Sequence, residues 1–66
     1  MTNSLKVLRA MANISQAELA DKIGVSRQTI NAMELGKYVP STVLALKLAA
    51  FFKKEVSEIF ALEDSD

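Results

Sequence analysis

The stretch SQAELADKIGVSRQTINAMEL, residues 15–35, decides the fold of this 66-residue chain. Ser15 and Glu18 have the spacing of a capping box, which predicts the start of a helix. Gly24 follows the last apolar residue of that helix, where a left-handed backbone closes a helix without the steric penalty of a side chain. Ser26 then predicts the N-cap of a second helix. The stretch therefore predicts two short helices joined by a tight turn.

Apolar residues at three- and four-residue spacing predict further helices on both sides of this stretch. One spans about residues 4–12, with Asn3 or Ser4 as its N-cap, and precedes a helix over about residues 15–22. The helix after Ser26 ends near Leu35. The remaining two begin at Pro40 or Ser41 and at Glu55, and the first of these is broken by Lys53 and Lys54. That fourth helix is apolar on most sides, which implies that neighbouring elements or a partner subunit cover it.

Composition excludes most enzyme chemistry. The chain has no cysteine and no histidine, so it offers no thiol nucleophile, no imidazole base and no zinc site. Its carboxylates and lysines show neither paired geometry nor metal-ligand spacing, and no glycine-rich loop is placed to cradle a phosphate. We therefore expect no enzymatic activity, no cofactor and no metal.

Chain length sets further bounds. Residues 1–66 fit a single domain, and a chain of this size buries only roughly 60% of the surface that its unfolded form exposes. A second subunit is a natural source of further burial, so we expect a homodimer. No apolar run approaches the roughly 20 residues that cross a bilayer, and the first residues lack a signal-peptide pattern. The expected location is cytoplasmic, with no membrane partner.

The formal net charge of zero hides a division of charge along the chain. Residues 1–54 carry eight basic and three acidic side chains, an excess of five positive charges. Residues 55–66 carry five acidic side chains and no basic one. This asymmetry predicts a basic working body and an acidic end that is kept away from the partner, although the acidic end could simply aid solubility.

Two short helices joined at Gly24 form a helix-turn-helix arrangement, which presents its second helix to the major groove of DNA. Here the sequence resembles the lambda-repressor and Cro-like helix-turn-helix family, the Cro/C1-type regulators of phages and bacteria. The resemblance covers about residues 5–60 and is carried by Ser15 to Ala20, Gly24 to Ile30, Glu34, Gly36 with Lys37, Pro40, Leu44 to Leu46, and Ile59 with Phe60. The chain is most similar to the short single-domain dimeric repressors of the cytolysin-operon type.

The resemblance implies an all-α fold, a compact five-helix lambda-repressor-like bundle with the helix-turn-helix over about residues 15–35. In the similar short repressors the two chain ends form a small antiparallel sheet, and residues 1–4 and 59–63 could form it here. Thr2, Asn3 and Ser4 are weak strand formers, which argues against this sheet.

The second helix of the motif has an inward and an outward side. Helical steps of about 100° place Ile30 and Met33 on the inward side. Gln and Asn can bond adenine, Arg can hold guanine, and a small apolar group can meet the methyl group of thymine. The expected base contacts are the outward residues Arg27, Gln28, Asn31 and Ala32.

Phosphate contacts are expected at helix starts and in the loop after the motif. Gln16 begins a helix, where free amides and the helix dipole favour an anion, and the family places a backbone-contacting Gln there. Such contacts position the protein on DNA without reading its sequence. The expected phosphate contacts are Gln16, Ser26, Thr29, Lys37, Tyr38 and Ser41.

The resemblance implies two structural roles as well. Arg9 and Glu34 are expected to form a partly buried ion pair that fixes the recognition helix against the bundle. Family repressors bind DNA as two-fold dimers, and here we expect the dimerisation region to be about residues 50–62. The expected interface residues are Phe52, Ile59, Phe60 and Leu62, with the monomer core as a near-equal interpretation for Phe60.

The predicted function is sequence-specific binding of double-stranded DNA by a transcriptional regulator, a repressor that binds a palindromic operator as a homodimer. An alternative is a DNA-binding antitoxin that neutralises a partner toxin and autoregulates its operon. In that alternative the acidic and apolar end, Ile59–Asp66, would cover the toxin.

Overall fold

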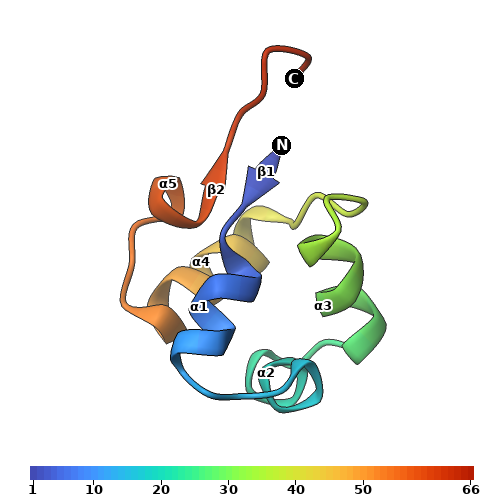
Figure 1. Ribbon diagram of the computed structural model, residues 1–66, viewed down its shortest axis with the longest axis vertical. Coiled ribbons are helices and arrows are strands. Elements are labelled where there is room, and N and C mark those ends of the chain that lie inside the picture. The colour runs from blue at the N-terminus through green and yellow to red at the C-terminus, as the bar shows by residue number, and fades with distance from the viewer.

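The computed structural model describes residues 1–66 as five helices and two short strands. Their order is β1 (Thr2–Asn3), α1 (Leu5–Met11), α2 (Gln16–Ile23), α3 (Arg27–Glu34), α4 (Thr42–Phe52), α5 (Val56–Ile59) and β2 (Phe60–Ala61). Figure 1 shows the strands side by side at the end of the molecule where the termini lie, with α2 at the opposite end. The expected five-helix bundle is confirmed, and each helix lies within two residues of its expected bounds. The small terminal sheet is present as well, although the weak strand formers Thr2, Asn3 and Ser4 argued against it.

The ends of α2 and α3 follow the local sequence signals. Ser15 Oγ accepts a hydrogen bond from the Glu18 amide, and a Glu18 carboxylate oxygen accepts one from the Ser15 amide, both at 3.0 Å. Gly24 closes α2 with φ +83°, a left-handed conformation that glycine adopts readily. Ser26 caps α3 by accepting a hydrogen bond from the Thr29 amide at 3.1 Å. These caps hold α2 and α3 at the two ends of a short turn.

A single apolar core holds the bundle together. Ala20 lies in this core, and its small side chain allows the close approach of α2 and α3. No helix has both the length and the apolar character that a membrane span requires. The core consists of Leu5, Leu19, Ala20, Ile23, Ile30, Met33, Leu44, Leu48, Ile59 and Phe60.

The terminal strands pair in the register Thr2 to Ala61 and Asn3 to Phe60. Asn3 also ties this sheet to the helices. Its Oδ1 accepts a hydrogen bond from the Leu5 amide at 3.1 Å, and its Nδ2 donates to the Met33 carbonyl oxygen at 2.7 Å. The N-cap of α1 is Ser4, but its side chain makes no capping bond, because its hydroxyl donates to the Glu58 carbonyl oxygen at 3.1 Å.

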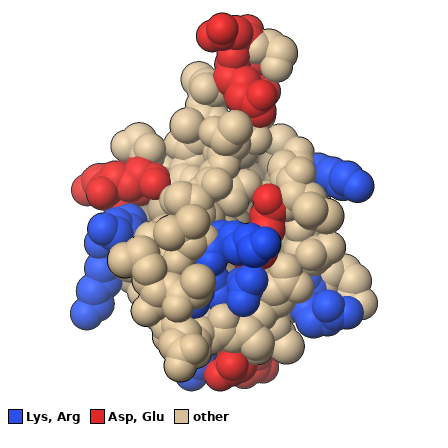
Figure 2. All heavy atoms as spheres, in the orientation of Figure 1, with Lys and Arg blue, Asp and Glu red and all other residues tan.

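The acidic C-terminal segment folds back on the N-terminus. The Met1 ammonium lies 2.9 Å from a Glu63 carboxylate oxygen and 2.8 Å from an Asp66 carboxylate oxygen. Hydrogen bonds to Asp66 and Glu63 raise the pKa of the Met1 amino group, and bonds from the Glu63 amide and the ammonium lower the pKa of Asp66. Figure 2 shows acidic side chains gathered at the end of the molecule where the termini lie.

Two of the four expected dimer-interface residues lie inside the monomer. The side chains of Ile59 and Phe60 belong to the core, so they offer almost no surface to a second copy. Phe52 is half-buried and packs edge-to-face on Phe51, with 5.0 Å between the ring centroids. Leu62 alone of the four is largely exposed, at 82%. The monomer core therefore accounts for the apolar character of Ile59 and Phe60, and their part in a dimer interface stays a prediction.

Helix α4 is covered on one side only. Leu44 and Leu48 are buried, but Val43 and Leu46 are 63% and 57% exposed. The neighbouring elements thus cover Leu44 and Leu48, and partly cover Ala45, Ala49, Phe51 and Phe52, whereas Val43 and Leu46 face outward.

Candidate nucleic-acid interface

Helix α3 has one buried and one exposed side. Ile30 and Met33 are completely covered by the bundle. The four expected base-contacting residues lie on the other side, with Ala32 half-buried and Arg27, Gln28 and Asn31 exposed. A helix held in this way presents polar side chains that can both donate and accept hydrogen bonds.

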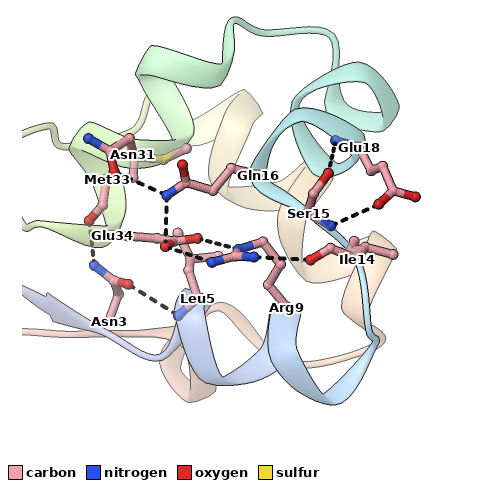
Figure 3. A network of polar contacts seen from close by, with 10 residues as sticks. All are labelled: Asn3, Leu5, Arg9, Ile14, Ser15, Gln16, Glu18, Asn31, Met33 and Glu34. Carbon is pink, nitrogen blue, oxygen red and sulfur yellow. Dashed lines mark hydrogen bonds and ion pairs between the residues drawn. The ribbon is translucent and has the colours of Figure 1, made fainter.

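The side of α3 that faces α1 carries a partly buried ion pair. Arg9 Nε lies 2.8 Å from Glu34 Oε2, and Arg9 Nη2 donates to Glu34 Oε1 at 3.3 Å. Arg9 Nη1 donates to the carbonyl oxygen of Ile14 at 3.0 Å, just before the start of α2. A two-pronged contact of guanidinium and carboxylate fixes orientation as well as distance. The expected ion pair is thus present and joins α3 to α1 (Figure 3).

Gln16 connects this ion pair to the exposed side of α3. Its Nε2 donates to Glu34 Oε1 and to Asn31 Oδ1, each at 3.1 Å (Figure 3). Both hydrogens of the Gln16 amide group are therefore used inside the protein, and its side chain has none left for a phosphate. The main-chain amides of Gln16 and Ala17 lie in the first turn of α2, where amides have no intrahelical acceptor, so they can serve an anion instead.

The Glu34 carboxylate remains ionised in this setting. Burial acts to raise the pKa of Glu34, but hydrogen bonds from Arg9 and Gln16 and the nearby charges of Arg9 and Lys6 outweigh it. The pKa of Glu34 consequently lies below its ordinary value. An ionised carboxylate accepts hydrogen bonds and donates none, so a group that bonds to it has to be a donor.

Serine hydroxyls stand at the starts of α3 and α4. Ser41 Oγ accepts a hydrogen bond from the Leu44 amide at 3.1 Å. Ser26 Oγ accepts from the Thr29 amide and shares a 2.9 Å hydrogen bond with the Thr29 hydroxyl. Capping uses the lone pairs of the serine oxygen, so the Ser41 hydroxyl hydrogen and one hydrogen of the Ser26–Thr29 pair remain free to donate to a phosphate.

The other two expected phosphate contacts lie in the loop between α3 and α4. Lys37 and Tyr38 are both exposed. The start of this loop is fixed because the Lys37 amide donates to the Ala32 carbonyl oxygen at 2.9 Å. The expected phosphate contacts thus occupy three helix starts and this loop.

Some contacts of the site have no signal in the sequence. The bond from Gln16 to Asn31 spans fifteen residues, and only the packing of α2 on α3 brings the two amides together. The bond from Asn3 to Met33 likewise depends on where β1 lies. The sequence marks Gln16 only as a polar residue at a helix start. Such a residue is as consistent with a contact to a ligand as with a contact inside the protein.

Comparison with known proteins agrees with this geometry. The profile of the helix-turn-helix family matches residues 5–59, which is most of the chain. The chain belongs to this helix-turn-helix family. An uncharacterized HTH-type transcriptional regulator of Methanocaldococcus jannaschii is 53% identical over the full length of both chains, and one of Bacillus subtilis is 44% identical, also over both full lengths. Another from Archaeoglobus fulgidus is 41% identical over this whole chain and 93% of its own length.

The Arg9–Glu34 ion pair is expected to stabilise the folded chain. Replacement of Glu34 by glutamine keeps the shape but leaves the Arg9 charge without a partner, and we expect a loss of about 2–3 kcal/mol at pH 7. Because the pKa of Glu34 is lower in the folded chain than in the unfolded chain, the contribution is complete above about pH 4.5 and is lost as pH falls through the folded pKa. The difference between wild type and Glu34→Gln should therefore shrink as the pH falls below about 4.5.

Urea unfolding at several pH values measures this difference. Asp21→Asn is the matched control, because Asp21 is an exposed carboxylate on α2 and its replacement should change stability little. A Glu34→Gln deficit that stays constant from pH 7 to pH 3, or no deficit at all, would contradict the role given to the ion pair.

Proposed function

We propose that this protein represses transcription by binding a palindromic DNA operator as a homodimer, with α3 inserted into the major groove. The coarser role, DNA binding in transcription regulation, follows from the helix-turn-helix family to which the chain belongs. Its relatives in Methanocaldococcus jannaschii and Bacillus subtilis are described as HTH-type transcriptional regulators. The chain would act in the manner of the short single-domain dimeric repressors, in the cytoplasm.

The single observation that carries the proposal is that α3 is fixed against the bundle on one side and exposes polar side chains on the other. Arg27, Gln28 and Asn31 are exposed on a helix whose other side is buried and whose end is held by the Arg9–Glu34 ion pair. These side chains have the donors and acceptors that match base edges in the major groove. We assign base reading to these three residues and to Ala32, which can meet a thymine methyl group.

Phosphate contacts on either side would fix the register of α3. We assign them to the main-chain amides at Gln16, to the free hydroxyl hydrogens at Ser26, Thr29 and Ser41, and to Lys37 and Tyr38 in the loop after α3. Helix N-termini attract phosphates because their amides lack acceptors and carry the positive end of the helix dipole.

Selection of bound sequences from random duplex DNA tests the function directly. We expect a palindrome whose half-sites lie about one helical turn, roughly 34 Å, apart. The logarithm of the affinity should fall as the logarithm of the salt concentration rises, with a slope of about one for each phosphate that a cationic side chain neutralises.

Lys37→Gln should weaken binding to all sequences evenly and reduce that slope by about two, one for each copy, without changing the selected palindrome. Lys54→Gln, beyond the end of α4, is the matched control and should leave the affinity and the slope unchanged. Weak binding without any sequence preference would overturn the proposed function.

An exposed apolar face supports the homodimer. Val39, Val43, Leu46 and Leu62 are between 57% and 82% exposed, and we call them the α4 face. Val39 and Leu46 line a groove together with Phe60, and Val43 lies one turn from Leu46 on the same helix. Leu62 follows Phe60 by two residues, a spacing that directs both side chains of an extended segment to the same side.

The occupant that we propose for this face is a second copy of the chain. The one charged group on the residues that line the groove is the Met1 ammonium, and Glu63 and Asp66 neutralise it within the chain. Two identical faces can therefore meet across a two-fold axis without strong repulsion between like charges. A palindromic operator requires two copies related by such an axis. The dimer interface is thus assigned to the α4 face, with Leu62 retained from the sequence-based expectation and Phe52 outside it.

Sedimentation equilibrium tests this dimer. We expect wild type to be a dimer at micromolar concentration and Leu46→Glu to be a monomer that binds the full palindrome at least roughly ten-fold more weakly. Met11→Glu is the control, because Met11 is 76% exposed on α1 and lies outside the α4 face. A monomeric wild type, or a Leu46→Glu variant that dimerises as wild type does, would rule this interface out.

The antitoxin alternative has weaker support. Within the segment that would cover a toxin, Ile59 and Phe60 are already buried in the core. The acidic end of that segment is bound to the Met1 ammonium. Copurification of a protein from a neighbouring gene would favour the alternative.

The acidic end gives a separate prediction. Deletion of residues 63–66 removes three carboxylates and frees the Met1 ammonium, so affinity for nonspecific DNA should rise several-fold at about 50 mM salt and much less at 300 mM. A full-length variant with Glu63→Gln, Asp64→Asn and Asp66→Asn separates charge from chain length and should behave like the deletion. Unchanged nonspecific affinity in both variants would mean that the acidic end serves solubility alone.

A further inference from the structure

We propose that Asn3 is a positioning residue, which holds the end of α3 at a fixed place relative to the dimer face and so sets the spacing of the half-sites that the dimer binds. The inference rests on the proposed homodimer and on the proposed insertion of α3 into DNA. It adds a residue outside both contact surfaces that determines which operators fit the dimer.

The Asn3 side chain joins the terminal sheet to α3. Asn3 Nδ2 donates to the Met33 carbonyl oxygen at 2.7 Å, across thirty residues of the chain. This carbonyl lies in the last turn of α3, where carbonyl oxygens have no further helical turn to bond. The Gly36 amide also donates to it, at 2.9 Å. The bond from Asn3 is the only hydrogen bond between either strand and α3.

The sheet places Asn3 beside the proposed dimer face as well. Asn3 lies opposite Phe60 in the ladder, and next to this pair the Ser4 amide donates to the Ile59 carbonyl oxygen at 2.9 Å. Phe60 lines the groove of the α4 face, and Leu62, which belongs to that face, directly follows β2. Asn3 therefore stands between a residue of the groove and the end of α3.

The two polar atoms of Asn3 have separate tasks. Oδ1 accepts a hydrogen bond from the Leu5 amide at 3.1 Å, two residues along the chain, a bond that Asp and Ser side chains can also make. The Met33 carbonyl oxygen only accepts, so the part of Asn3 that bonds to it has to be the NH2 group. Figure 3 shows both bonds. A substitution can thus remove the bond to α3 and keep the bond to α1.

The position of α3 relative to the dimer face decides which operators fit. One base pair inserted between the half-sites moves one half-site by about 3.4 Å along the DNA and rotates it by about 35°. A dimer in which each α3 is held to the sheet beside the dimer face cannot follow this change. When the bond from Asn3 is absent, the end of α3 can shift against that face, and other spacings become acceptable.

Operators with one base pair inserted or removed at the centre of the palindrome test the proposal. For wild type we expect binding roughly ten-fold weaker than to the selected operator, about the cost of a mismatched base pair. Asn3→Asp keeps an acceptor for the Leu5 amide and loses the donor to Met33, so the same loss should be about three-fold or less, with unchanged half-site sequence.

Ser4→Ala is the matched control. It removes a neighbouring bond of similar length, from the Ser4 hydroxyl to the Glu58 carbonyl oxygen at 3.1 Å, which joins the start of α1 to α5 and not to α3. Ser4→Ala should therefore keep the wild-type preference for one spacing. Asn3→Ser also lacks the NH2 group but adds no charge, and it serves as the test if Asn3→Asp does not fold, which a thermal unfolding curve would show.

A distance measurement on the free dimer tests the position of α3 without DNA. The chain has no cysteine, so Gln28→Cys provides one site per copy for a spin label on the exposed side of α3. Pulsed electron paramagnetic resonance then gives the distribution of distances between the two labels. We expect one narrow distribution for the wild-type and Ser4→Ala backgrounds, and a broader one for Asn3→Asp and Asn3→Ser.

Several results would overturn the proposal while leaving the proposed function intact. These are equal binding of wild type to all three spacings, an unchanged spacing preference in folded Asn3→Asp or Asn3→Ser, and an even loss of affinity at all spacings, which would limit Asn3 to a role in stability. Failure of wild type to form a dimer or to select a palindrome would instead overturn the proposed function, and this inference with it.

Discussion

The Glu34 carboxylate is the point at which three helices of the bundle meet. Arg9 reaches it from α1, Gln16 reaches it from α2, and Glu34 itself ends α3. A carboxylate that is almost buried costs several kcal/mol unless charged and polar partners surround it. The chain supplies those partners from the two helices that α3 has to be aligned with, so the same contacts that satisfy the charge also fix the direction of α3.

The apolar core and this polar cluster have separate tasks. Ile30 and Met33 press α3 against the bundle, but apolar packing alone is tolerant of small rotations about the helix axis. Hydrogen bonds between fixed donors and acceptors are more selective in geometry. A base contact depends on which side of α3 faces outward. We therefore infer that the apolar core fixes how closely α3 packs on the bundle, and that the Arg9–Glu34–Gln16 cluster fixes the rotation of α3 about its own axis.

The sequence predicts the elements of this fold well because their ends carry local signals. The capping box at Ser15 and the left-handed glycine at Gly24 depend only on near neighbours, and both are found as expected. The pattern cannot separate Leu44 and Leu48, which are buried, from Val43 and Leu46, which are exposed, because α4 is apolar on most sides in the sequence. Apolar character alone likewise does not tell whether Ile59 and Phe60 belong to the core or to a dimer interface, and the structure shows both side chains in the core.

Side-chain contacts between elements were the least predictable part of the candidate site. The sequence predicts a phosphate contact at Gln16, but it does not indicate that the crossing of α2 and α3 brings the side-chain amide of Gln16 to Glu34 and Asn31. The sequence likewise shows an excess of acidic residues at its end, but only the structure shows that the Met1 ammonium holds Glu63 and Asp66.

The most direct test of the central claim, that α3 and the start of α2 form the DNA-binding surface, is an NMR titration of backbone amides with the selected operator. We expect the largest chemical-shift changes at Gln16, Ala17 and Arg27–Ala32, with only small changes in α5 and the two strands. Changes that are largest in α5 or the terminal sheet, with α3 unaffected, would contradict the claim.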